Sequence, residues 1–72
     1  MAQLTHEQYD ALERAVTDRA RIAVWRRGTE YLVVPKRLRI EGGREAIDAM
    51  HPTTGHSLTL YIDEVDAIEV VR

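Results

Sequence analysis

The stretch LRIEGGREAIDAMHPTTGHSLTLYI, residues 38–62, decides the fold of this chain. Apolar and polar side chains alternate along most of it, which is typical of strands that bury one face. Gly42-Gly43 predicts a tight hairpin turn, and the PTTG segment at residues 52–55 predicts a second turn. The alternation places one set of side chains on a shared inner face: Leu38, Ile47, Ala49, Leu58, Leu60 and Ile62.

The two turns also define how the three strands pair. The predicted pairs are Glu41 with Arg44, Leu38 with Ile47, Arg37 with Asp48, Ala49 with Leu58, and Ile47 with Leu60. A shift by one residue would turn every apolar side chain outward, so this register is strongly specified. Glu45 falls on the inner face and is therefore expected at its rim.

A helix is predicted before the sheet, from His6 to Asp18. Thr5 and Gln8 have the spacing of a capping box, in which each side chain bonds the backbone N–H of the other residue. The apolar stripe of this helix is formed by Tyr9, Leu12 and Val16. A single stripe with charges elsewhere indicates that the helix lies on the sheet.

A further hairpin is predicted around Gly28, between the helix and the quoted stretch. We favour a three-residue loop at 27–29, because it keeps four aliphatic side chains on one face; a two-residue loop of Gly28-Thr29 would turn Trp25 inward. The pairs of the favoured register are Arg26 with Glu30, Trp25 with Tyr31, Val24 with Leu32, and Ile22 with Val34. Pro35 cannot donate to a ladder and marks a sheet edge or a bulge.

Five short strands with one apolar face, the last at residues 68–71, predict a sheet that rolls up until its edges meet. The fold class is therefore α+β and mainly β. A helix at residues 5–18 caps a five-stranded antiparallel barrel at residues 21–72. The chain of 72 residues is expected to form a single domain.

Composition excludes several classes of protein. The chain has no cysteine, which rules out disulfides and cysteine zinc sites. No apolar run reaches the length of a membrane-spanning helix, and the acidic N-terminus is unlike a secretory signal. A cytoplasmic location is therefore expected. Residues 19–44 carry eight bases against two acids, and residues 45–72 carry six acids against one base, so the two segments are expected to pair across strands.

A resemblance to known small barrels adds to these patterns. The segments that carry it are Ile22-Ala23-Val24-Trp25, Gly28, YLVVP at 31–35 with Leu38, and LTLYIDEVDAI at 58–68. The element order is similar to Sm-like barrels, and residues 21–71 resemble the barrel of WYL domains, which occur in bacterial transcriptional regulators. The Trp-Tyr-Leu triplet of that family would lie on the strand holding Glu45-Ala46-Ile47 and is absent, so no ligand is carried over.

One set of candidate binding residues shares the outward face in the favoured register: Trp25, Tyr31, Arg37, Arg39 and Tyr61. Aromatic side chains among arginines suit stacking on bases and neutralising phosphates, so this face is a candidate nucleic-acid or partner surface. The alternative explanation gives these residues a structural role, in which Arg37 pairs with Asp48 and Trp25 and Tyr31 form a cross-strand pair or a subunit contact. The pI of 5.9 and the absence of a lysine cluster weigh against nucleic acid.

No constellation of residues predicts catalysis, a metal site or a cofactor. His51 and His56 face each other across the third hairpin, but structural zinc takes four ligands. Ser57 follows His56 directly, and neighbours along a strand point to opposite faces. The acids Asp63, Glu64 and Asp66 lack the spacing of a calcium loop.

The functional hypothesis is a non-enzymatic bacterial barrel that acts through protein contacts, either with a protein partner or as a homo-oligomer. The alternatives are nucleic-acid binding through the arginine and aromatic residues, and a WYL-like regulatory sensor module. No membrane partner is expected, and the sequence names no small-molecule ligand.

Overall fold

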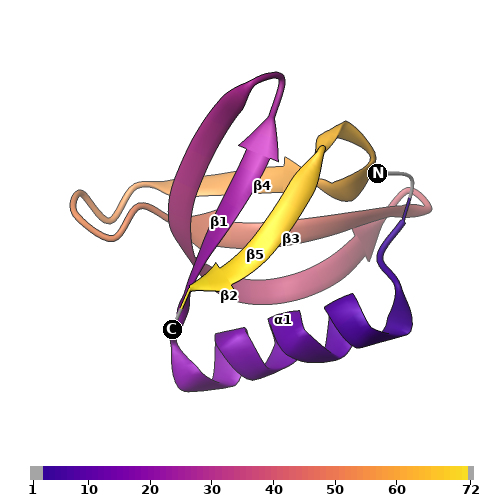
Figure 1. Ribbon diagram of the computed structural model, residues 1–72, viewed down its shortest axis with the longest axis horizontal. Helices are drawn as coiled ribbons and strands as arrows, with labels where there is room; N and C mark the ends of the chain where they lie inside the picture. Colours follow the sequence, from indigo (N-terminus) through magenta and orange to yellow (C-terminus); the bar gives the residue numbers. More distant parts are fainter. Residues whose placement is uncertain (1–2, 72) are drawn as a thin grey trace.

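The computed structural model describes residues 3–71, in which one helix packs on a strongly bent antiparallel sheet (Figure 1). The elements are α1 (His6–Asp18), β1 (Arg21–Arg26), β2 (Thr29–Glu41), β3 (Arg44–Met50), β4 (Ser57–Tyr61), the 3-10 turn η1 (Ile62–Glu64) and β5 (Ala67–Val71). This is the expected α+β, mainly β class. No helix in residues 3–71 is both long enough and apolar enough to cross a lipid bilayer.

The predicted bounds of α1 and its capping box are confirmed. The Gln8 backbone N–H donates to Thr5 Oγ1 at 3.1 Å, and the Thr5 N–H donates to Gln8 Oε1 at 2.9 Å. The predicted stripe is only partly right, because Tyr9 is 37% exposed while Leu12 and Ala15 are buried. The helix is therefore rotated toward Ala15, whose small side chain allows close contact with the sheet.

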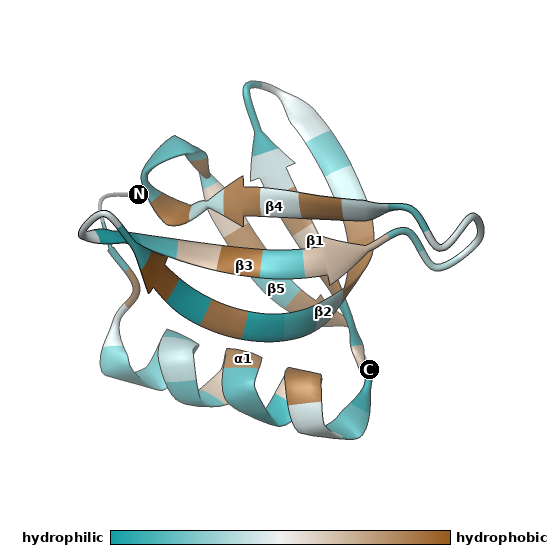
Figure 2. Ribbon diagram, turned by 180° about the vertical axis from the view of Figure 1, so that it is seen from behind, coloured by the Kyte–Doolittle hydropathy of each residue, from teal (hydrophilic) through white to brown (hydrophobic). Residues whose placement is uncertain are grey.

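A bulge divides β2 into two halves. The register shifts between Pro35 and Arg37, and Pro35 is fully buried. A proline is tolerated inside a sheet at a bulge because the ladder there needs no N–H. Residues 29–33 of β2 pair with β1 and residues 34–41 pair with β3, so the sheet folds over on itself close to the bulge. Figure 2 shows this curvature, with apolar and polar residues alternating along β2 and β3.

The predicted closure into a barrel is wrong. The strand order is β4-β3-β2-β1-β5, and in residues 3–71 no ladder joins β4 to β5. The interior is sealed without that ladder, because α1 and the turn at η1 contribute apolar side chains to the core. Ile62 and Val65, at and after η1, are buried to 1% and 0% exposure. Both β4 and β5 are consequently edge strands.

The core lies between the two halves of the bent sheet and under α1. Its buried members are Leu12, Ala15, Ile22, Val24, Val33, Ile47, Ala49, Leu60, Ile62 and Val65. The inner face predicted for residues 38–62 is confirmed, with Leu38 and Leu58 partly buried against this core. Glu45 is half-buried, and its Oε1 accepts a hydrogen bond of 2.9 Å from the Leu4 N–H.

The second and third hairpins have the predicted registers, including Leu38 opposite Ile47 and Ile47 opposite Leu60. Arg37 pairs with Asp48 as expected. Glu41 lies opposite Arg44, but Glu41 bonds to Arg39 while Arg44 bonds to acids after β4.

Neither register considered for the first hairpin is correct. The loop consists of Arg27 and Gly28, whose φ angles are 53° and 76°. Two residues with positive φ match the turn type that suits the twist of a tight hairpin. The arginine is held in this unusual conformation by its N–H, which donates to Asp66 Oδ2 at 3.2 Å. Tyr31 therefore lies opposite Val24 instead of Trp25.

The buried and exposed isoleucines of the sheet give a direct test of this fold. Ile47 is 0% exposed, whereas Ile40 is 73% exposed. We expect Ile47→Val to lower the free energy of unfolding by about 1 kcal/mol, because it removes a methylene from a packed site. Ile40→Val is the matched control and should change it by less than about 0.5 kcal/mol. Urea unfolding measures both, and equal effects would contradict the assigned inner face.

Candidate interaction surfaces

A charged network covers the outer face of β2, β3 and β4. Its centre is Asp48 on β3, whose Oδ2 lies 2.8 Å from Nε of both Arg37 and Arg39. The Thr59 hydroxyl donates to Asp48 Oδ1 at 3.0 Å from β4. The strand pairing explains this convergence, because Arg37, Asp48 and Thr59 occupy one cross-strand row.

The network continues toward the second hairpin. Glu41 accepts hydrogen bonds from Arg39 and from the Tyr61 hydroxyl, the latter at 3.2 Å. The Arg44 guanidinium lies over the Tyr61 ring, 4.0 Å from its centroid. Arg44 also makes two bonds of 2.8 Å to the carboxylate of Asp63. We call this set the arginine face: Arg37, Arg39, Glu41, Arg44, Asp48, Thr59, Tyr61, Asp63 and Glu64.

The arginine face keeps its carboxylates ionised. Hydrogen bonds from Arg39 and then Arg37 lower the pKa of Asp48 to about 2. The bond from Arg39, followed by that from Tyr61, lowers the pKa of Glu41, and the bonds from Arg44 lower the pKa of Asp63. The expected pairing of the basic segment 19–44 with the acidic segment 45–72 is confirmed here, so the positive charge of this face is largely neutralised within the chain.

The five predicted site residues do not form one surface. Arg37, Arg39 and Tyr61 lie together on the arginine face. Trp25 is half-buried on β1, where it lies between Glu30 and Ala67 on the two neighbouring strands. Tyr31 is partly buried against the core. The Arg26 guanidinium lies 5.0 Å from the centroid of its ring, and Arg26 Nη2 donates to the Tyr31 hydroxyl at 3.3 Å.

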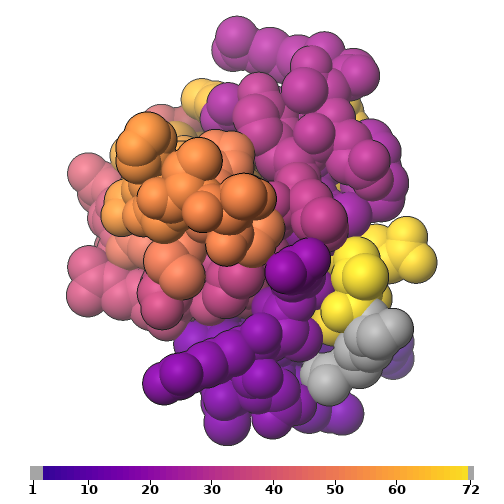
Figure 3. All heavy atoms as spheres, turned by 90° about the vertical axis from the view of Figure 1, so that its left-hand side faces the viewer, coloured from indigo at the N-terminus to yellow at the C-terminus, as the bar shows by residue number. Residues whose placement is uncertain are grey.

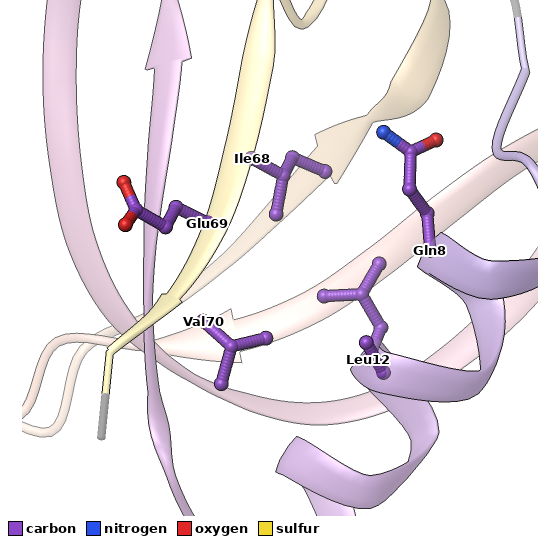
Figure 4. A pocket seen from close by; sticks show the side chains of 6 residues that line it. Gln8, Leu12, Ile68, Glu69 and Val70 are labelled. Carbon is purple, nitrogen blue, oxygen red and sulfur yellow. The ribbon is translucent and has the colours of Figure 1, made fainter.

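An apolar groove that the sequence did not predict lies between α1 and the edge strand β5. Its volume is about 310 Å³. Its lining residues are Gln8, Ala11 and Leu12 from α1, with Ile68, Glu69 and Val70 from β5. Ile68 and Val70 project from β5 toward the helix, while Glu69 points away (Figure 4). We call this the α1–β5 groove.

The groove lies away from the most prominent loop of the molecule. The loop between β3 and β4 projects from the left-hand side of the molecule in Figure 1 and faces the viewer in the space-filling view, where the end of β5 lies beside the end of α1 (Figure 3). The alternation of Ile68 and Val70 was visible in the sequence, but nothing in it indicates that β5 forms a sheet edge beside α1. Sequence reasoning therefore missed the groove because it depends on topology.

The described residues contain no group of three or more His, Asp or Glu side chains that could hold a metal ion. His51 and His56 are linked through their backbones, with the His51 N–H donating to the His56 carbonyl at 2.9 Å. This bond closes the neck of the third hairpin.

The arginine face predicts a specific pH dependence. A carboxyl whose pKa is lower in the folded chain stabilises the fold above its ordinary pKa, and that contribution is lost as the pH falls through the folded value. Asp48→Asn should lower the free energy of unfolding at neutral pH by about 1 kcal/mol. The difference from the parent chain should vanish as the pH falls from 3.8 toward about 2. Urea unfolding across this range is the measurement.

Asp10→Asn is the control, because Asp10 is exposed on α1 and far from β3 in the sequence. A difference for Asp48→Asn that persists unchanged at the lowest pH would contradict an ionic contribution from Asp48.

Comparison with models of protein families, with curated proteins and with solved structures finds no match to this chain.

Proposed function

We propose that the chain is a non-enzymatic interaction module that binds protein through the β5 edge and the α1–β5 groove. The observation that carries the proposal is an edge strand whose inner face borders an apolar groove of about 310 Å³. The two features belong together, because a strand added to β5 would place alternate side chains beside the groove.

The backbone of β5 supplies the first half of such a contact. Within the described residues β5 forms a ladder with β1 alone. An edge strand presents N–H and C=O groups that can pair with another extended segment. Strand addition of this kind takes its affinity from main-chain hydrogen bonds and is therefore tolerant of sequence.

The groove supplies the second part of such a contact, which is selectivity for the side chains of the partner. Ile68 and Val70 are half-buried, and Ala11 leaves space on the helix opposite them. An extended partner would direct every second side chain toward these residues, and apolar side chains would be favoured there. Glu69 points to the opposite side, where it would meet the outward side chains of the partner.

The arginine face is poorly suited to nucleic-acid binding, which favours a function through protein contacts. Arg37 and Arg39 both bond to Asp48, and Arg44 bonds to Asp63. A phosphate would have to displace these carboxylates, whose pKa values are lowered by the same contacts. A surface with its charges paired attracts a polyanion weakly.

The assignment to Sm-like or WYL-like domains is part of the proposal. It is supported by the order of one helix, five antiparallel strands and a 3-10 turn before β5. The open edges between β4 and β5 depart from a closed barrel, and they make a contact through β5 accessible.

A displayed library of random extended peptides provides the test. We expect selected peptides to carry apolar residues at alternate positions, and to shift the amide resonances of Ile68, Glu69, Val70 and Ala11 in a titration. Ala11→Arg should weaken binding at least about tenfold, because a long charged side chain then fills the groove.

Thr17→Arg is the matched control, since it adds the same side chain to an exposed position of α1 that does not line this groove. Selected peptides whose binding is insensitive to Ala11→Arg, or a library that yields no binder, would refute a peptide site in this groove.

A further inference from the structure

A stripe of α1 runs beside the α1–β5 groove and carries charges without partners. Glu7, Ala11 and Arg14 follow each other at spacings of four and three residues, which places them on one side of the helix. Glu7 and Arg14 are exposed, and no ion pair among residues 3–71 includes either of them. This differs from the arginine face, where the charges are paired.

We infer that the partner of the α1–β5 groove is a second copy of this chain, related by a two-fold axis that passes beside Ala11. The inference rests on the proposed function, because it uses the same groove and the same strand edge. A two-fold interface uses one patch on both copies, so that patch has to be complementary to itself.

The stripe on α1 meets this condition. When two copies of α1 pack antiparallel about Ala11, Glu7 of each copy lies near Arg14 of the other. The alignment therefore forms two equivalent ion pairs from four unpaired charges. Ala11 sits at the crossing point, where a small side chain lets the helices approach closely. The same charges in a parallel alignment would place Glu7 beside Glu7 and Arg14 beside Arg14.

The strand edge meets the same condition in a specific register. When two antiparallel copies of β5 pair, Ile68 and Val70 of both copies stay on the inner side only if even-numbered residues lie opposite even-numbered residues. A register centred on Glu69 would set Glu69 opposite itself, which is unfavourable. A register centred on Ile68 sets Ala67 opposite Glu69 and aligns the two apolar Ile68 side chains, so it is the register we expect.

The proposed interface on α1 and β5 is small, so the dimer is expected to be weak. The helix has 13 residues and is therefore about 20 Å long, and β5 has five residues. A standard interface buries about 800 Å² on each partner, and smaller contacts are usually weak or transient. We therefore expect a dimer with a dissociation constant of about 1–100 μM.

Sedimentation equilibrium of the full chain from about 1 μM to about 500 μM tests this inference. We expect reversible dimerisation. Glu7→Arg and Arg14→Glu should each weaken the dimer about tenfold, because each change replaces two attractive pairs by two repulsive ones. The double variant Glu7→Arg/Arg14→Glu exchanges the charges and should restore the affinity to within about threefold.

Glu13→Arg is the matched control. It makes the same substitution as Glu7→Arg at an exposed position two residues from Ala11, which lies on the opposite side of the helix, and it should leave the dimer intact. Far-ultraviolet circular dichroism of each variant establishes that α1 is retained. Because the chain has no cysteine, Ala11→Cys adds a second readout: oxidation should link the two copies through position 11, whereas Thr17→Cys should not link them.

The outcomes separate this inference from the proposed function. A chain that stays monomeric at about 500 μM overturns the self-contact, while peptide binding at the groove would still support a module that binds other proteins. A dimer that is unaffected by the single and double charge variants, and whose Ala11→Cys form does not cross-link, overturns the placement of the interface. The outer face around Trp25, with the exposed Leu32 and Val71, is then the surface to which the dimer contact would be assigned.

Discussion

The bend in β2 at Pro35 is the constraint on which the rest of the structure depends. One strand of 13 residues serves both halves of the sheet, and its bend at the bulge lets these two halves enclose the core. A straight β2 would leave Val33 and Ile47 on one flat surface instead of burying both completely. In a chain of this size, few other arrangements could bury that much apolar surface.

The bend also explains why the molecule has free strand edges. The two edge strands β4 and β5 do not pair in the folded sheet. Leu12 and Ala15 of α1, with Ile62 and Val65 at and after η1, complete the core in their place. Because α1 seals the core beneath the sheet, the side of β5 that faces the helix is only partly covered. The α1–β5 groove follows from this incomplete contact.

Local patterns predicted those parts of the structure that depend on local physics. The registers from Leu38 to Ile62 follow from alternation and turn chemistry, and both are confirmed. The first hairpin could not be predicted in this way, because its loop requires an arginine at positive φ that is tied to Asp66, 39 residues away. The same error placed Tyr31 on the outer surface. Barrel closure and the groove depend on how α1 meets the sheet, and no local pattern encodes that contact.

Two groups of charges in the chain differ in where their partners lie. On the arginine face, strand pairing brings Arg37 and Arg39 to Asp48, and these groups stabilise the sheet that holds them. On α1, Glu7 and Arg14 are two helical turns apart, which is too far for a direct ion pair within the helix. Opposite charges at this spacing become neighbours when an antiparallel copy of the same helix is centred between them. The surface with paired charges is therefore suited to holding the fold, and the stripe beside the groove is suited to recognising another molecule.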